Sequence, residues 1–202
     1  MSTTSAVSRA AEFRDLLPRQ VFVADGAMGT MLYSKGVFIN RCFDELNLSQ
    51  PAMVKEIHQE YVKCGAQILE TNTFGATRIR LGAFGMAEKC QVINEAGVRL
   101  AREAAQERAF VAGAIGPLGI QLEPLGPTSF AEAHAAFAEQ ARFLVDAGVD
   151  LLMLETFGNL NELREALFAA REVAGPEMVI VAQITIDDYG NMLDGKEAAV
   201  YG

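Results

Sequence analysis

The feature that most constrains the fold is a regular alternation of apolar, β-branched runs with segments of helical period. The apolar runs lie at about residues 21–24, 66–70, 110–115, 149–154 and 178–186. Parallel strands need a crossover connection of about a dozen residues or more, and that connection is usually a helix. The alternation therefore predicts a parallel α/β fold, either a closed (β/α)8 barrel or an open doubly wound sheet.

Local start signals mark the helices between these runs. A serine and then Pro51 precede a helical pattern that continues to Gly65. Ser129–Glu132 has the spacing of a capping box, and Asn159–Glu162 is expected to open the next helix in the same way. Another helix is predicted over about residues 87–107, where apolar side chains share one face.

Carboxylates stand where four of the predicted strands end, at Asp25, Glu70, Glu155 and Asp187. In parallel α/β folds, the carboxyl ends of the strands carry the ligand site. Glu155 follows a run of four apolar residues and cannot easily reach solvent, so it is either paired within the fold or kept for a cationic ligand. Asp187 is more typical of a turn with the residues that follow it.

Composition excludes several classes of protein. A net charge of −9 argues against a nucleic-acid or anionic-membrane surface. No apolar run approaches the ~20 residues that span a bilayer. Three cysteines without CxxC spacing fit a reducing cytoplasm. We expect residues 1–19 to form a flexible lead or a short helix, and residues 20–202 to form one domain.

Other polar or glycine-rich features have ordinary explanations. The histidines His58 and His134 lie among charged neighbours on helices, and we expect them to be surface or half-buried residues. The run Gly113–Gly119 has the wrong spacing and position for a dinucleotide fingerprint. Cys64 and Cys90 are expected to pack, whereas Cys42 could reach the rim.

Five motifs in order resemble the homocysteine S-methyltransferase family, and most closely the amino-terminal homocysteine-binding domain of cobalamin-dependent methionine synthase. The motifs are Asp25–Thr30, Cys42–Asn47, Glu70–Ala76, Gly116–Pro117 and Leu154–Phe157. The resemblance covers about residues 20–188. It implies a (β/α)8 barrel, of which about the first five βα units are present, and methyl transfer to the sulfur of homocysteine to give methionine.

The resemblance also implies roles for particular residues. The substrate-binding positions would be Asp25, Gly26, Asn72, Glu155 and Thr156. Glu155 would hold the substrate's ammonium group, and Glu70 is a possible further residue of the rim. An amino acid carries one cation and one carboxylate, which a partly desolvated Glu and free backbone N–H groups can bind.

The family's zinc ligands are one Cys after the sixth strand and a Cys-Cys pair after the eighth. No cysteine of this chain is at a matching position, and the chain ends at Gly202, soon after the predicted fifth strand. We therefore expect a truncated domain that has no catalytic or metal-binding residue of its own. It would be inactive without a C-terminal half. The expected partners are homocysteine and that half or further methionine-synthase-type modules, and the favoured methyl donor is methyltetrahydrofolate through cobalamin.

Two alternatives stay open from the sequence. The first is a non-catalytic barrel fragment or amino-acid-binding remnant. The second is a lyase or aldolase barrel in which a rim of carboxylates holds Mg²⁺. The second is less favoured because the sequence has neither a phosphate-binding glycine signal nor a lysine at a strand end.

Overall fold

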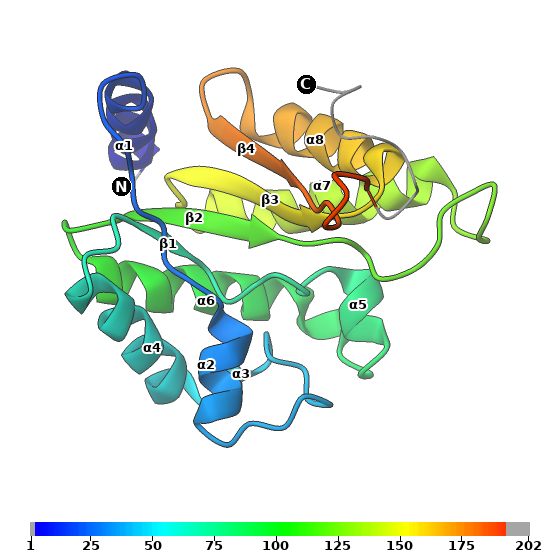
Figure 1. The fold of residues 1–202 in the computed structure, drawn as a ribbon, viewed down its shortest axis with the longest axis horizontal. Helices are drawn as coiled ribbons and strands as arrows, with labels where there is room; N and C mark the ends of the chain where they lie inside the picture. The colour runs from blue at the N-terminus through cyan, green and yellow to red at the C-terminus, as the bar shows by residue number, and fades with distance from the viewer. Residues whose placement is uncertain (1–2, 193–202) are drawn as a thin grey trace.

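The computed structural model describes residues 3–192, with side chains from residue 9 onward. Its centre is a four-stranded sheet in the order β1-β2-β3-β4 (Figure 1). The strands are β1 (Ile68–Glu70), β2 (Phe110–Ile115), β3 (Leu151–Phe157) and β4 (Val179–Ile184). The helices are α1 (Thr3–Leu16), α2 (Met28–Ser34), α3 (Leu46–Ser49), α4 (Pro51–Lys63), α5 (Arg78–Gly82), the 3-10 turn η1 (Ala87–Lys89), α6 (Cys90–Ala105), α7 (Phe130–Asp146) and α8 (Leu160–Ala174). Within this part of the chain, no helix has the length and apolar character needed to cross a membrane.

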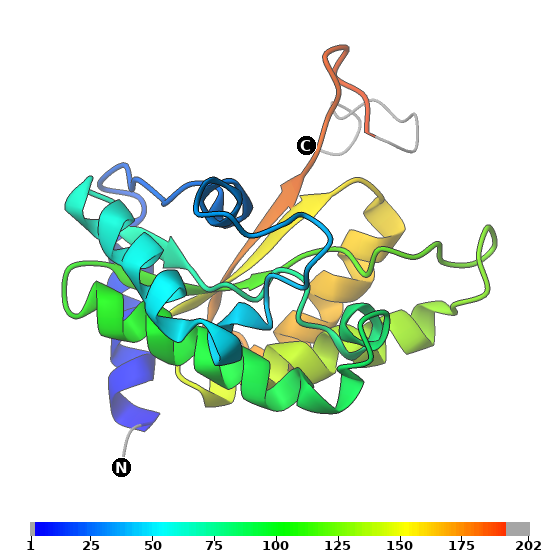
Figure 2. The ribbon, with the colours of Figure 1, turned by 90° about the horizontal axis from the view of Figure 1, so that it is seen from below.

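All strand pairs are parallel, and each strand pairs with the next one along the chain. Helices connect each pair, so the predicted parallel α/β alternation is confirmed. Helices α6, α7 and α8 cover one face of the curved sheet (Figure 2). Along each strand, successive side chains point to opposite faces of the sheet. Leu69 and Leu152 pack under the helices, whereas Ile68, Leu151 and Met153 point to the opposite, inner face.

The amino-terminal lead forms helix α1, which was one of the two options that the sequence left open. Phe13 of this helix is buried against the inner face, with its ring 5.1 Å from that of Phe110. Arg9 donates hydrogen bonds to Asp150 and to the carbonyl of Ala109. Helix α1 therefore covers the amino end of the inner face.

The strand expected over residues 21–24 is not a strand, and that prediction was wrong. Ala24 makes an isolated parallel bridge to Ile68, and the carbonyl of Val23 accepts the Ile68 N–H. Val21 is 88% exposed. Strand β1 has only three residues, so it offers few backbone groups with which residues 21–24 could form a regular ladder of hydrogen bonds. The described part of the chain thus has four strands and a bridging segment instead of five strands.

The two expected helix caps differ in the structure. Ser129 and Glu132 form the predicted capping box at the start of α7. Asn159 caps α8 with its side chain, but Glu162 does not complete a box. Its carboxylate instead accepts the N–H of Leu118 at 2.7 Å, because that N–H is buried and needs a partner.

His58 is fully buried, so the prediction of a surface or half-buried residue was wrong. Helix α4 begins at Pro51 as expected, and its buried stripe includes Val54, Ile57 and His58. His58 follows Val54 by four residues and therefore lies on the same helix face. The charged sequence neighbours of His58 obscured this spacing.

Candidate functional site

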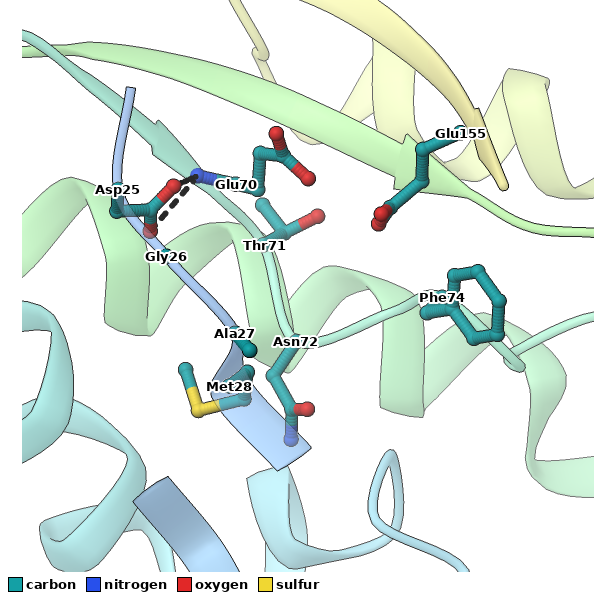
Figure 3. A pocket seen from close by; sticks show the side chains of 9 residues that line it. All are labelled: Asp25, Gly26, Ala27, Met28, Glu70, Thr71, Asn72, Phe74 and Glu155. Carbon is teal, nitrogen blue, oxygen red and sulfur yellow. Dashed lines mark hydrogen bonds between the residues drawn. The ribbon is translucent and has the colours of Figure 1, made fainter. Parts of the chain in front are cut away.

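Three carboxylates from separate parts of the chain face one cavity near the carboxyl ends of the strands (Figure 3). Asp25 follows the bridge to β1, Glu70 is the last residue of β1, and Glu155 lies in β3. The cavity has a volume of about 300 Å³. Its other lining residues are Gly26, Ala27, Met28, Thr71, Asn72 and Phe74. None of these lining residues is a lysine, arginine or histidine, so the cavity is acidic.

Strand alternation explains why two of the carboxylates meet. Glu70 lies two residues after Ile68, and Glu155 lies two residues after Met153, so both share the parity of the inner face. Strand β2 lies between β1 and β3 and contributes the small Ala112 to this face. The two longer glutamate side chains therefore reach the same space.

A β-bulge ends the apolar part of β3 beside Glu155. Between Leu154 and Phe157, β3 contains one residue more than the facing segment of β4. Thr156 has a φ of +63°, a left-handed conformation that a β-branched residue rarely adopts. The extra residue returns Phe157 to the helix-covered core, where it is fully buried, and leaves Glu155 on the cavity side.

Asp25 is fixed by the backbone of β1. Its two carboxylate oxygens lie 3.1 and 3.2 Å from the N–H of Glu70, and its own N–H donates to the carbonyl of Ile68 at 2.9 Å. Burial raises the pKa of Asp25 to about 7, although the Glu70 N–H opposes this shift. The nearby charge of Glu155 raises the same pKa further.

Glu70 and Glu155 form a carboxyl pair. Burial raises the pKa of both, and the charges of Glu155 and Asp25 raise that of Glu70 further. The interaction between the two carboxyl groups raises the pKa of Glu70 and opposes the rise in the pKa of Glu155. Two carboxylates that face one cavity repel each other when both are ionised, which favours a state in which one of them keeps its proton.

Asn72 offers the cavity an acceptor only. Its side-chain amide donates to the carbonyl of Phe43 at 2.8 Å and to Oδ1 of Asn47 at 3.1 Å, which uses both N–H groups. The side chain is almost fully buried, and its own Oδ1 accepts no hydrogen bond from the described residues. A ligand that donates hydrogen bonds would satisfy this oxygen.

The backbone next to Asp25 offers donors. Among residues 3–192, no protein group accepts the N–H of Gly26 or of Ala27. A side chain at position 26 would meet the hydroxyl of Tyr61, because a Cβ placed there lies 3.0 Å from it. Glycine therefore fits this close approach, and the free N–H groups suit a carboxylate ligand.

A second cavity of about 440 Å³ adjoins the first, and the two share the lining residues Ala27, Met28, Asn72, Phe74 and Glu155. Of the five predicted substrate-binding residues, Thr156 lines only this second cavity. The other four line the first cavity. Arg80 also lines the second cavity, with its guanidinium 5.2 Å above the Phe74 ring and a hydrogen bond to the carbonyl of Pro117. Sequence reasoning missed Arg80, because nothing in its local pattern distinguishes it from a solvated helix residue.

Phe74 is held by the glycine-rich run after β2. The N–H of Gly116 donates to the carbonyl of Phe74 at 2.9 Å, and a Cβ at position 116 would lie 2.3 Å from the Phe74 ring. Glycine at this position therefore serves close packing beside the cavity.

Asp187 does not reach the cavity. Its Oδ1 accepts the N–H groups of Tyr189 and Asn191 at 2.9 Å each, which confirms the predicted turn. The rim of four carboxylates that would hold Mg²⁺ is therefore not assembled, and residues 3–192 contain no group of three or more His, Cys, Asp or Glu side chains placed for a metal ion.

The cysteines do not fit a zinc centre. Cys42 and Cys90 are buried at separate places, and Cys64 is exposed. Burial raises the pKa of the Cys42 thiol to about 11 and that of Cys90 to about 12, whereas zinc binds the thiolate. Cys42 does line the second cavity, as the sequence allowed, but its thiol lies 3.7 Å from the Asp44 carboxylate and finds no second ligand there.

Comparisons with known proteins agree with this geometry. Methionine synthases of Mycobacterium tuberculosis (strain ATCC 25618 / H37Rv) and Mycobacterium leprae (strain TN) are 33% and 32% identical over 198 residues. Each match covers 91% of this chain but only 16% of the relative. The metallated crystal structure of the homocysteine methyltransferase MmuM from Escherichia coli aligns with a TM-score of 0.78 and 27% identity, over 92% of this chain and 70% of that one.

The described sheet and helices thus form part of a (β/α)8 barrel. The family model for homocysteine S-methyltransferase matches residues 22–201, which is most of the sequence. The chain therefore belongs to the homocysteine S-methyltransferase family.

Proposed function

We propose that this chain provides the homocysteine-binding part of a zinc-dependent homocysteine S-methyltransferase that forms methionine. The observation that carries the proposal is the acidic cavity, which lacks an internal cation and lies beside free backbone donors. An α-amino acid brings one ammonium group and one carboxylate. The cavity has hydrogen-bonding partners for both.

The available atoms suggest one orientation for the substrate. The ammonium group would lie between Glu155 and the free Oδ1 of Asn72, and the carboxylate would accept the N–H groups of Gly26 and Ala27. Asp25 would support this arrangement through its hydrogen bonds with the backbone of β1. The sulfur-bearing side chain would then extend toward the second cavity.

Zinc and the methyl donor belong to the proposal through the family resemblance alone. No cysteine of the described chain fits the metal, so we assign no step to zinc here. The proposed ligands are cysteines outside residues 1–202, and the proposed donor is methyltetrahydrofolate through cobalamin. Under this proposal, the chain binds homocysteine but does not transfer a methyl group alone.

The binding proposal is tested by Glu155→Gln in the full protein, with Glu95→Gln on the exposed face of α6 as the matched control. A buried charge-assisted hydrogen bond contributes about 1.5–3 kcal/mol, which corresponds to about a 10- to 100-fold change in affinity. Isothermal titration with homocysteine should show a loss of that size for Glu155→Gln and none for the control. Equal affinity in both variants would remove Glu155 from the site.

The non-catalytic alternative is distinguished by a homocysteine-dependent methylation assay on the full protein. Binding together with methyl transfer supports the enzyme. Binding without methyl transfer, with every tested donor and with zinc supplied, supports an amino-acid-binding remnant.

A further inference from the structure

We infer that Glu70 and Glu155 hold one proton between them in the empty site and release it when the α-ammonium group of an amino acid binds. Amino-acid binding would then be linked to pH through the protein itself. The inference rests on the proposed function and adds a role for Glu70, a residue that the proposed binding of homocysteine does not use.

The placement of the two glutamates carries the inference. Both side chains point into the same cavity from the inner face of β1 and β3 (Figure 3). Asp25 occupies the third side, where it accepts the Glu70 N–H. Asn72, which is 6% exposed, directs an unsatisfied oxygen toward the same space. Four acceptor groups therefore surround a cavity that has no cationic side chain, and the Thr71 hydroxyl in its wall is already engaged by Thr73 and the Ala114 N–H.

The charged and titratable groups around the pair are few. They are Asp25 at the cavity wall, Tyr61 of α4 beside Asp25, and Arg41, Cys42, Asp44 and Arg80 at the adjoining cavity. Arg80 already contacts Phe74 and the carbonyl of Pro117, and it does not line the smaller cavity. In the empty site, a proton is therefore the positive charge that offsets the two glutamates. The ammonium group of a ligand is a cation that can replace this proton.

The exchange is balanced. The O–H bond of the Glu70 carboxyl breaks and its proton passes to water or buffer. The bound ammonium group then donates hydrogen bonds to the two ionised carboxylates and to the Asn72 oxygen. Beside the two glutamates, the ammonium group replaces the positive charge of the released proton, while the ligand's carboxylate is bound separately by the N–H groups of Gly26 and Ala27. No oxidation or reduction takes place.

Methionine is the probe of choice, because its thioether has no proton to lose and cannot imitate the effect. Titration calorimetry of the full protein in two buffers of different ionisation enthalpy measures the number of protons released. We expect about one proton per methionine at pH 7, and a dissociation constant that falls by up to about tenfold per pH unit between pH 6 and 8.

Glu70→Gln keeps a hydrogen-bond donor toward Glu155 but has no proton to release. This variant should bind methionine without proton release, with a dissociation constant that is constant from pH 6 to 8 and weaker than that of the unmodified protein at pH 8. Asp25→Asn should retain the release. Loss of the release in Asp25→Asn and its persistence in Glu70→Gln would assign the proton to Asp25 and overturn the inference.

The unmodified protein decides the question even if a variant fails to fold. Methionine binding without proton release or pH dependence would overturn this inference and leave the proposed function standing. Failure of both homocysteine and methionine to bind would overturn both.

Discussion

Both ends of the sheet hold carboxylates that are buried or half-buried, and they satisfy them in opposite ways. At the amino end, the fully buried Asp150 accepts hydrogen bonds from Arg9, from Arg102 and from a backbone N–H of β2. At the carboxyl end, Glu70 and Glu155 face a cavity without a cationic side chain, and Glu155 accepts only a long hydrogen bond of 3.5 Å from the Thr156 hydroxyl. The first arrangement is complete without a ligand, whereas the second is not.

The packing around the two ends follows the same division. Phe13, Phe22 and Phe110 form an aromatic cluster that fills the inner face at the amino end. The carboxyl end of that face instead has a cavity. The comparison teaches that burial of a carboxylate alone does not identify a binding site, and that the absence of an internal partner does.

The largest expected effect lies at the satisfied end. Asp150→Ala leaves Arg9, Arg102 and the Val111 N–H without their shared acceptor, and breaking a buried ion pair costs about 3–5 kcal/mol. Urea unfolding should show a loss near the lower limit, because Arg102 is about one-third exposed.

The control is Glu103→Ala, which removes a surface pair with Lys55 and should change stability by less than about 1 kcal/mol. Equal losses in the two variants would contradict the contrast between the two ends.

At the unsatisfied end, a gradual loss of stability is expected as pH rises. The pKa of Asp25 is raised to about 7 and that of Glu70 is also raised, so the folded state binds more protons than the unfolded state above the ordinary carboxyl range. The free energy of unfolding should therefore fall between pH 5 and 7, by at most about 1.4 kcal/mol per pH unit for each proton. Urea unfolding at pH 5, 6 and 7 measures this fall, and Glu70→Gln should flatten it.

His58 provides an internal check on the sign. Burial lowers its pKa to about 4, and both of its ring nitrogens lack a partner in the described structure. The folded state therefore resists protonation of His58, and this residue makes stability rise with pH between about 4 and 6.5. His58→Leu should steepen the fall between pH 5 and 6.5. An unchanged slope in both His58→Leu and Glu70→Gln would refute this assignment of the titrating groups.

The smallest effect is expected at the bulge. Thr156→Gly removes a β-branched side chain from a left-handed conformation and should stabilise the fold by about 1 kcal/mol or less. The same change removes a wall of the second cavity and frees the backbone beside Glu155, so the affinity for homocysteine should fall. Thermal unfolding and calorimetry measure the two effects. A variant that is less stable and binds as before would show that the conformation is unstrained and unrelated to the site.

Much of the fold could be predicted because its signals are local. The capping box at Ser129 and the proline at the start of α4 depend on neighbouring residues, and both are confirmed. The strand expected over residues 21–24 failed because strand formation depends on the length of the neighbour, which the segment's own sequence does not contain. Glu162 failed as a capping residue because a buried N–H far along the chain competes for its carboxylate.

The site was predictable as a set of strand ends but not as a set of contacts. Strand ends place Asp25, Glu70 and Glu155 at one rim, and the structure brings them together. The sequence could not show that Glu70 and Glu155 face the same cavity, because their approach depends on the small residue that β2 places between the two strands. Arg80 was missed for the same reason, since its position beside Phe74 is set by tertiary packing.

The bulge in β3 also changes how this chain should be aligned with its relatives. Along a regular strand, the facing of each side chain depends on whether its position is odd or even, and a bulge is what lets one extra residue be inserted without turning the residues after it to the other face. The position of an alignment gap between Leu154 and Phe157 therefore decides which residue of a relative is matched to the side chain that faces the cavity. In a relative that lacks the extra residue, regular alternation would place the aromatic residue aligned with Phe157 in the core without a bulge, and only one residue of β3 would separate it from the residue aligned with Leu154.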